Sequence, residues 1–231
     1  MASKVLIVLI VLLQSSQTFA LIGGKELLNT KDLVRLEFEK RESICSGFYI
    51  TPFTIITAAH CFYSYQDHHF LKLEKIVADQ ESEILVTNAK QIPHPQYYIG
   101  SWSPNDVAII QVDENHHFEG TFSLGDEETS TLGKLTLYGT GITNIKSNIY
   151  GRSFGANTFV RLFSFIFSFG EPAIAPHDSG APIIENTTHR VIGIASKTTT
   201  TMFIDQFLPS VSIGTSLMEK SNLDFVRLNK K

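Results

Sequence analysis

Three short segments decide the fold and the chemistry expected of this chain: TAAHC at residues 57–61, NDVAI at residues 105–109 and HDSGAP at residues 177–182. They supply His60, Asp106 and Ser179, in that order along the chain. These residue types can build a nucleophilic site, in which a histidine base activates a serine hydroxyl and a carboxylate orients the histidine. One serine beside a glycine carries little information, whereas three such segments in a fixed order carry much more.

Length and composition are those of a globular protein with a substantial core. The chain has 231 residues, 43% of them hydrophobic, which suits one large domain or two small ones. The formal net charge is −4 and no block of lysine and arginine occurs. Nucleic acid and anionic membranes are therefore not expected as partners.

The first twenty residues have the pattern of a secretion signal. Lys4 provides a positive start, residues 5–13 are an unbroken apolar run, and residues 18–20 (TFA) end in a small residue suited to signal peptidase. The apolar run is too short to span a bilayer, and the alternative is a buried amino-terminal helix or strand. We expect a protein that is secreted and has no membrane attachment after cleavage.

The chain has two cysteines, Cys45 and Cys61. In an oxidising compartment such a pair is expected to form one disulfide, and two free buried thiols are the alternative. Because Cys61 follows His60, a bridge would also restrain the backbone that carries the histidine. The sequence Asn186-Thr187-Thr188 is a glycosylation sequon, which is relevant if the chain is secreted.

Strand-like segments, rich in β-branched and aromatic residues, dominate the chain after residue 20. They lie at residues 48–50, 54–57, 84–87, 107–112, 134–138, 158–169, 182–184 and 190–195. Turn-like clusters separate them, which predicts an all-β sandwich or barrel. One helix is expected at about residues 216–228. The polar stretch at residues 113–130 is the candidate linker between two halves.

Further segments complete a resemblance to the trypsin/chymotrypsin-like serine peptidases, in which histidine, aspartate and serine follow one another in the same order. LIGG at residues 21–24 resembles the mature amino terminus of that family, and CSG at residues 45–47 resembles one end of its histidine loop. IGIAS at residues 192–196 is similar to the strand beside the substrate cleft, and PSV at residues 209–211 is similar to a pocket wall.

The resemblance implies an all-β fold of two six-stranded antiparallel β-barrels with a C-terminal α-helix. The active site would lie in the crevice between the barrels. Residues 1–20 would be a signal peptide and residues 21–231 a trypsin-like peptidase domain. The N-terminal barrel would occupy about residues 21–120, and the C-terminal barrel with the helix about residues 121–231.

The resemblance also implies roles for individual residues. Ser179 would be the nucleophile, His60 its general base, and Asp106 the carboxylate that orients His60. The hydroxyl of Ser196 would support Asp106. The oxyanion hole would consist of the backbone N–H groups of His177 and Ser179.

The freed amine of a mature chain is expected to pair with Asp178, the residue before the nucleophile, and so to shape the oxyanion hole. Leu21 follows Ala20 directly, so signal peptidase itself could release LIGG without a propeptide. We therefore expect Leu21 and Asp178 to form an activation pair without a latent stage. Cleavage a few residues away is the alternative.

His177 is the main departure from the family pattern, which has glycine at this position. Glycine tolerates backbone angles that a Cβ atom resists, so histidine could strain the loop or turn one oxyanion donor away. Losing one such donor costs about 100- to 1000-fold in rate. The alternative is that the backbone angle remains accessible and the imidazole only lines the rim.

The expected specificity pocket is also unusual. Its floor would be Ala173 with Ile174 beside it, so no aspartate is present to attract lysine or arginine. Its walls would involve Ser196, Thr198 and Ser210, and side chains at the last two positions would make the pocket shallow. We expect a preference for small or medium apolar residues. Lys197 stands where the family usually has tryptophan.

The sequence thus predicts a secreted, monomeric serine endopeptidase that acts on protein or peptide substrates and can meet protein protease inhibitors. No cofactor is expected, and no metal site, because the adjacent histidines at residues 68–69 and 116–117 would point to opposite faces of a strand. One alternative is a catalytically weak or inactive homologue that acts as a binding or regulatory protein. An esterase-like hydrolase is disfavoured because no Gly-x-Ser-x-Gly elbow is present.

Overall fold

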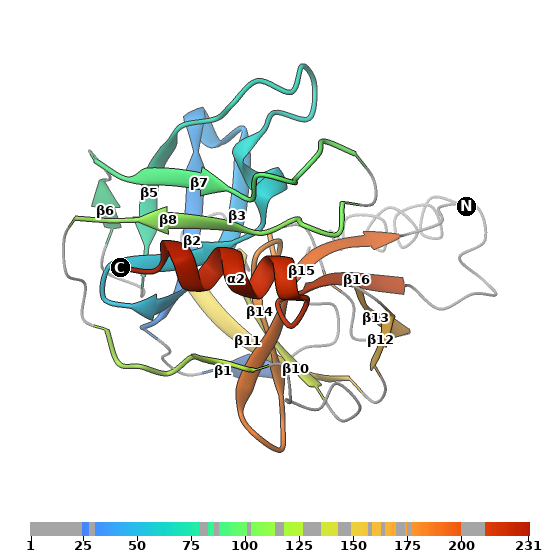
Figure 1. Cartoon of the computed structure of the whole chain (residues 1–231). Helices are drawn as coiled ribbons and strands as arrows, with labels where there is room; N and C mark the ends of the chain where they lie inside the picture. The colour runs from blue at the N-terminus through green and yellow to red at the C-terminus, as the bar shows by residue number, and fades with distance from the viewer. Residues whose placement is uncertain are drawn as a thin grey trace, which may run out of the picture.

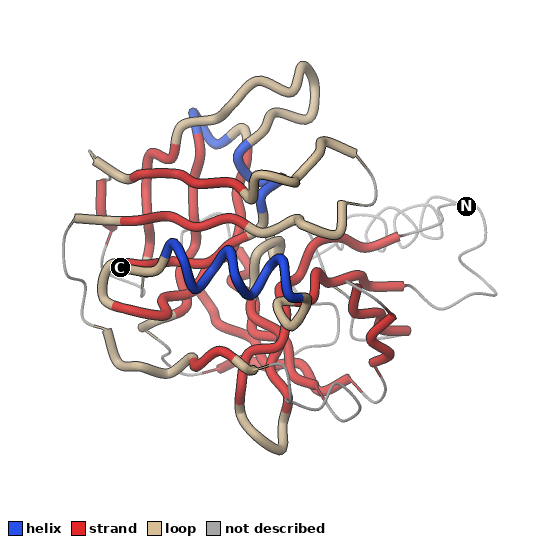
Figure 2. The backbone as a smooth tube through the Cα atoms, viewed as in Figure 1, coloured by secondary structure: helices blue, strands red, loops and turns tan. Residues whose placement is uncertain are grey.

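The computed structural model describes residues 25–27, 31–78, 83–85, 88–100, 103–113, 118–126, 135–142, 149–156, 159–162, 165–169, 174, 177–199 and 211–231. Strands make up much of this part of the chain (Figure 2) and form two sheets. All the strand pairings except one are antiparallel.

The N-terminal sheet contains seven strands within the described residues. They are β2 (Leu33–Phe38), β3 (Ser43–Thr51), β4 (Thr54–Thr57), β5 (Leu73–Val77), β6 (Glu83–Leu85), β7 (Lys90–Pro93) and β8 (Ala108–Gln111). Their order in the sheet is β6-β5-β2-β3-β4-β8-β7. The edge strands β6 and β7 are thus consecutive in the chain, so one short segment links both edges and brings the sheet toward a closed barrel.

The C-terminal sheet contains nine strands within the described residues. They are β1 (Lys25–Leu27), β9 (Ser123–Leu124), β10 (Leu135–Ile142), β11 (Ile149–Ala156), β12 (Phe159–Leu162), β13 (Phe165–Phe169), β14 (Pro182–Glu185), β15 (Arg190–Thr199) and β16 (Val211–Ser216). The main order is β1-β11-β10-β14-β15-β16-β13-β12, and β9 pairs in parallel with β15. The short strand β1 precedes the N-terminal sheet in the chain but pairs with β11.

The predicted fold class is confirmed: two antiparallel half-barrels are followed by one C-terminal helix (Figure 1). The described sheets have seven and nine strands instead of six each. The first sheet includes the three-residue strand β6, which pairs with β5 at one edge. The second sheet is enlarged by three short strands, β1, β9 and β12.

Strand β2 shows why sequence patterns missed part of the fold. Arg35 and Glu37 interrupt its apolar residues, yet both side chains are only 4% exposed and pair through Arg35 Nη2 and Glu37 Oε1 at 2.5 Å. A charged residue is rarely buried without a partner. The partner of Arg35 is Glu37, two residues later in the same strand. Both side chains are buried because β2 lies between β3 and β5 in the sheet.

The described part of the predicted linker at residues 113–130 packs against the N-terminal sheet. Phe122 is buried and packs edge-on against Phe48 of β3, with ring centroids 5.4 Å apart. Asp32 is fully buried and accepts hydrogen bonds from the backbone N–H groups of Glu119 and Thr121, at 2.9 and 2.6 Å. These contacts fasten the connection to the N-terminal sheet.

The terminal helix α2 (Lys220–Asn229) begins four residues later than predicted because residues 211–216 form β16. It lies beside β8 of the N-terminal sheet, although it follows the C-terminal sheet in the chain (Figure 1). Gln111 of β8 donates to the carbonyl of Asn229 at 2.7 Å, and the ring of His94 packs on Phe225 with centroids 4.7 Å apart. The helix therefore ties the two halves together.

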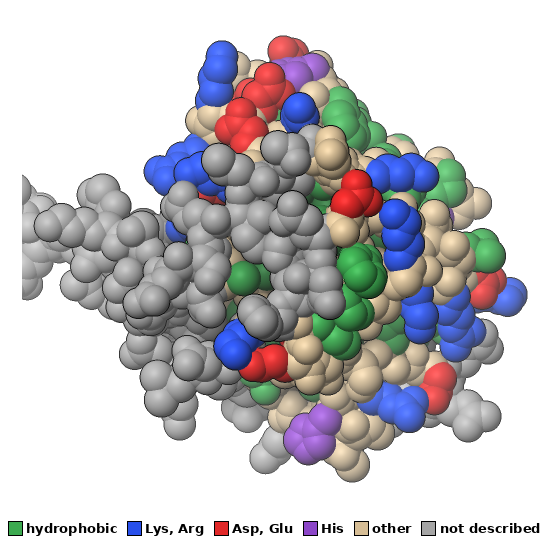
Figure 3. Space-filling model, turned by 90° about the vertical axis from the view of Figure 1, so that its left-hand side faces the viewer, with side chains coloured by type: hydrophobic (Ala, Val, Ile, Leu, Met, Phe, Trp, Pro, Cys, Tyr) green, Lys and Arg blue, Asp and Glu red, His purple; other side chains and the backbone are tan. Residues whose placement is uncertain are grey.

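Surface properties agree with the modest net charge. On the face shown in Figure 3, the visible described side chains include interspersed acidic and basic groups around a small hydrophobic area. Mixed charges of this kind do not create a field of one sign over that area. Among the described residues, no helix combines the length and the hydrophobicity needed to cross a membrane.

The predicted disulfide is present and joins Cys45 of β3 to Cys61 in the 3-10 helix η2 (Ala59–Phe62). The two residues are 16 positions apart. Replacing both with alanine should lower the free energy of unfolding by about 3 kcal/mol, because the bridge restricts the unfolded chain. Urea denaturation of the double variant and of the oxidised wild type measures the difference, and a loss below about 1 kcal/mol would contradict the expectation.

His94 connects the loop after β7 to helix α2 through a neutral ring. Its Nε2 lies 3.2 Å from the carbonyl oxygen of Ser221, and its Nδ1 accepts from the N–H of Gln96 at 3.1 Å. Protonating Nδ1 would break the second bond. Burial lowers the pKa of His94, and the hydrogen bond to the Ser221 carbonyl only partly opposes this shift.

This shift predicts a loss of stability in mild acid. The pKa of His94 is lower in the folded state than in the unfolded state. As the pH decreases below about 6.5, the unfolded state therefore binds more protons than the folded state, and the free energy of unfolding decreases until the pH has passed the folded pKa. We expect the free energy of unfolding to drop between pH 7 and pH 5, and to drop less in His94→Gln. Chemical denaturation at both pH values gives the two slopes. Equal slopes would contradict the role of His94, since His177 and His69 titrate in both proteins.

Candidate active site

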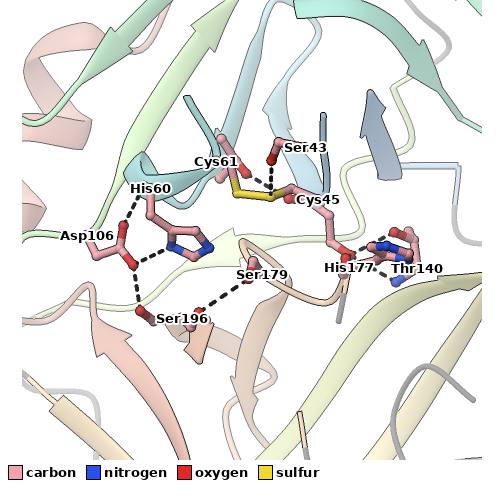
Figure 4. Close-up of a disulfide and its surroundings, with 11 residues drawn as sticks. Ser43, Cys45, His60, Cys61, Asp106, Thr140, His177, Ser179 and Ser196 are labelled. Atoms are coloured by element: carbon pink, nitrogen blue, oxygen red, sulfur yellow. Dashed lines mark hydrogen bonds and ion pairs between the residues drawn. A yellow bond between two sulfur atoms is a disulfide. The ribbon is translucent and has the colours of Figure 1, made fainter. Parts of the chain in front are cut away.

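His60 and Asp106 are held together by two hydrogen bonds at the edge of the N-terminal sheet (Figure 4). His60 lies in η2 directly after β4, and Asp106 lies just before β8, which pairs with β4. The backbone N–H of His60 donates to Asp106 Oδ1 at 2.8 Å, and His60 Nδ1 lies 2.8 Å from Asp106 Oδ2. Both bonds fix the imidazole so that Nε2 is the nitrogen left for chemistry.

Asp106 is a buried carboxylate that remains ionised because its neighbours compensate for the loss of water. Its Oδ2 also accepts from the hydroxyl of Ser196 at 2.5 Å. Burial by itself would raise the pKa of Asp106, but the charge of His60 and the hydrogen bonds from His60 and Ser196 outweigh it and lower the pKa. Such a carboxylate holds one tautomer of the histidine and stabilises its protonated form.

Ser179 lies on the turn before β14, facing His60 from the C-terminal sheet (Figure 4). Its hydroxyl donates to the carbonyl of Ser196 at 3.3 Å. Among the described residues, no hydrogen bond joins Ser179 Oγ to His60. Catalytic hydrogen bonds are often long or misaligned without substrate.

The turn that carries Ser179 is pressed against the N-terminal sheet. Gly180 has φ of 86°, and a Cβ atom there would collide with Thr57 Oγ1 and with backbone atoms of Ser46 and Ala58. The backbone N–H of Ser46 donates to the carbonyl of Ser179 at 2.8 Å. Two features therefore require glycine at residue 180: its positive φ angle, and the short distance between its backbone and the N-terminal sheet, which leaves no room for a Cβ atom.

His177 has φ of 78°, in the left-handed region that normally favours glycine. Its carbonyl accepts from the hydroxyl of Ser46 at 2.9 Å, and the same hydroxyl lies 2.7 Å from Thr140 Oγ1 of β10. Burial lowers the pKa of His177, and the positive charge of Arg35 lowers it further. The imidazole is therefore largely neutral near pH 7.

The backbone donors expected for an oxyanion hole are available. Within the described part of the chain, neither the N–H of His177 nor that of Ser179 donates to another residue. The φ angle of His177 is one that glycine adopts readily and that a residue with a Cβ atom resists. Charge that develops near these two groups could be stabilised if both N–H vectors point at it.

The remaining predicted site residues are only partly within the described chain. Ile174 is buried and Thr198 lies in β15. Asp178 is fully buried at the foot of the Ser179 turn. Three predicted residues, Leu21, Ala173 and Ser210, lie outside the described residues. The specificity pocket and the activation pair therefore stay predictions.

The sequon at Asn186 lies in the turn between β14 and β15. Asn186 is half-buried, and its Oδ1 accepts from the hydroxyl of Thr136 at 2.7 Å. The hydroxyl of Thr188, the third sequon residue, donates to Glu185 at 2.8 Å. Modification of Asn186 remains a prediction.

Two cavities flank the candidate site, and sequence patterns predicted neither. One of about 250 Å³ lies beside the disulfide and is lined by Arg41, Glu42 and His177, among others. The other, of about 480 Å³, lies on the far side of His60 and is lined by Tyr63 and other residues. Besides residues of β3, η2 and β15, their walls include loop residues whose tyrosines and charged side chains show no periodic pattern in the sequence.

Two groups of potential metal ligands occur among the described residues. Cys45, His60 and Cys61 form the first, but its sulfur atoms are joined in the disulfide. The second, at Glu42, Asp67 and His69, lies at the surface, and His69 Nδ1 already lies 2.6 Å from Asp67 Oδ1. Neither group supports a metal-dependent reaction.

Comparison with known proteins identifies the family. The family model named Trypsin matches residues 21–202. Granzyme B(G,H) of Mus musculus is 30% identical over 115 residues, covering 47% of this chain and 46% of that protein. Trypsin of Phaedon cochleariae is 26% identical over 141 residues, covering 58% and 54%. The chain thus spans about half the length of these curated relatives.

Solved structures agree in fold. A Glu endopeptidase superposes with a TM-score of 0.72 at 16% identity, covering 91% of this chain and 99% of that chain. A mutant of human heparin binding protein superposes with a TM-score of 0.63 at 16% identity, covering 91% and 98%. At this identity the likeness concerns the fold alone. The family model matches more than half of the chain, which shows that this chain belongs to the trypsin family of serine peptidases.

Proposed function

We propose that this protein is a secreted serine endopeptidase that uses His60, Asp106 and Ser179. The observation that carries the proposal is the doubly hydrogen-bonded pair of His60 and Asp106, facing the Ser179 turn across the junction of the sheets. A histidine fixed by a buried carboxylate beside a serine hydroxyl is the arrangement that acyl transfer needs.

In the proposed reaction, Ser179 Oγ attacks the carbonyl carbon of the scissile peptide bond while His60 Nε2 takes the hydroxyl proton. The N–H groups of His177 and Ser179 stabilise the resulting oxyanion. Collapse of this intermediate breaks the C–N bond, and His60 gives its proton to the leaving amine. Water then attacks the acyl-enzyme by the same route, which returns Ser179 and releases the carboxylic acid.

The proposed substrate is a protein or peptide bound along residues 196–198 of β15, whose main chain can add a substrate strand. Ala173 and Ile174 at the pocket floor, with Thr198 and Ser210 at its walls, would favour small or medium apolar residues over lysine and arginine. The proposed mature protein is a monomer of two barrels divided near residue 120. It is produced by cleavage before Leu21, its new amino terminus pairs with Asp178, and protein protease inhibitors can recognise it.

The second candidate function is that of a weak or inactive homologue that binds peptides without cleaving them. Two observations favour it: the Ser179 hydroxyl is bound to the carbonyl of Ser196, and His177 occupies a left-handed backbone conformation. Such a conformation costs a non-glycine residue about 1–2 kcal/mol.

A fluorophosphonate probe separates the two candidates. We expect the secreted protein, with its amino terminus at Leu21 verified by mass spectrometry, to be labelled once, at Ser179. Labelling should disappear in Ser179→Ala and fall at least about 1000-fold in His60→Ala, because the hydroxyl then lacks its base. A correctly processed wild type that resists labelling would refute the endopeptidase proposal, and a start elsewhere would refute the proposed processing.

His177→Gly tests whether the histidine limits the rate. Because the backbone at residue 177 already has a glycine-like φ of 78°, both oxyanion donors should remain in place. We expect the acylation rate of the variant to rise by less than about tenfold. Stopped-flow measurement with an activated ester gives this rate. An increase of about 100-fold or more would mean that His177 removes one donor from the wild-type site.

A further inference from the structure

The cavity of about 480 Å³ next to His60 has a chemical character of its own. Besides His60, Asp106 and Ser196, its lining includes Lys197 and the aromatic rings of Tyr63 and Tyr97. We call it the Lys197 cavity. Lys197 follows Ser196 on β15, so a ligand strand bound along residues 196–198 would pass the opening of this cavity.

The lining of the cavity includes one basic side chain, that of Lys197. Lys197 is half-buried, and His68 also lines the cavity. Burial lowers the pKa of Lys197, while the nearby Asp106 carboxylate opposes this shift. A partly desolvated ammonium interacts more strongly with an opposite charge than an exposed one does.

The one carboxylate among the described lining residues is already engaged. Asp106 is 4% exposed and accepts hydrogen bonds from the backbone and ring of His60 and from the hydroxyl of Ser196. It can therefore do little to attract a cationic side chain of a ligand. Among the described lining residues, the cavity thus offers hydrogen-bond donors and the ammonium of Lys197, while its one carboxylate is occupied by His60 and Ser196.

The aromatic wall adds further donors. Tyr63 and Tyr97 stack with ring centroids 5.6 Å apart and an interplanar angle of 25°. Burial raises the pKa of both hydroxyls, and the Asp106 charge raises that of Tyr97 further. The phenols thus keep their protons at neutral pH. Flat rings can cover the methylene groups of a ligand side chain while the hydroxyls donate to its polar end.

We infer that the Lys197 cavity takes a carboxylate side chain of a bound peptide, on the amino-terminal side of the scissile bond, and that Lys197 is the residue that selects it. The inference deepens the proposed function and rests on it, because it takes a peptide along β15 as the ligand. It adds an acidic requirement to a site whose expected primary pocket is apolar.

Peptide binding to the Ser179→Ala variant tests this selectivity without turnover. The probes are fluorescein-Gly-X-X-X-Val-Ser-Gly-amide peptides in which X is glutamate, glutamine or lysine, and fluorescence anisotropy gives each Kd. We expect the glutamate peptide to bind about three- to tenfold more tightly than the glutamine peptide in 50 mM salt, and the lysine peptide most weakly. Raising the salt to 500 mM should reduce the ratio.

Variants at residue 197 assign the effect to one side chain. In the Ser179→Ala background, Lys197→Met should make the glutamate and glutamine peptides equal, Lys197→Glu should reverse the order, and Lys197→Arg should preserve it. Lys72→Met removes an exposed lysine outside the cavity lining and should change nothing. Thermal unfolding checks that every variant is folded.

Each outcome is decisive. Equal Kd values for the glutamate and glutamine peptides in the unsubstituted cavity would overturn the inference, and so would a preference that survives Lys197→Met. Labelling of Ser179 by fluorophosphonate is measured separately. A protein that is labelled but does not prefer glutamate loses only this inference. A protein that prefers glutamate through Lys197 but is not labelled keeps this inference and loses the proposed catalysis.

Discussion

The hydrogen bonds of Ser46 hold the two sheets and the Ser179 turn in one arrangement. Its backbone N–H donates to the carbonyl of Ser179 at 2.8 Å, and its hydroxyl donates to the carbonyl of His177 at 2.9 Å. The same hydroxyl accepts from the N–H of Thr140 in β10 at 3.0 Å, and the Ser46 carbonyl accepts from the hydroxyl of Thr57 at 2.7 Å. Because Ser46, Thr57 and Thr140 are fully buried, leaving any of their hydrogen-bonding groups unpaired would be costly.

This junction explains how a histidine can occupy a backbone position suited to glycine. A left-handed angle persists at a non-glycine residue only where surrounding contacts impose it. At His177 those contacts are the hydroxyl of Ser46 on one side and the close packing of Gly180 on the other. The proposed oxyanion donors would therefore depend on the N-terminal sheet as much as on the turn that carries them.

Much of the fold and part of the candidate site were predictable from sequence, for physical reasons that differ between elements. Strands such as β4 and β14 each contain two consecutive isoleucines and are evident locally. Strand β2 was not predicted because it contains two charged residues, Arg35 and Glu37. In sequence such residues indicate an exposed segment, whereas in the structure they form a buried ion pair. Helix α2 was predicted, but it begins later in the structure than predicted. Residues 211–216 form a strand that pairs with β13 and β15.

The sequence by itself determined the family, the all-β class and the residues of the candidate triad, because each is carried by short segments whose order along the chain suffices. Only the tertiary structure decided how the segments meet. It set the two hydrogen bonds between His60 and Asp106, the left-handed angle of His177, and the cavity that brings Lys197 beside two tyrosines. These properties depend on contacts between residues that are distant in the chain, which a linear pattern does not encode.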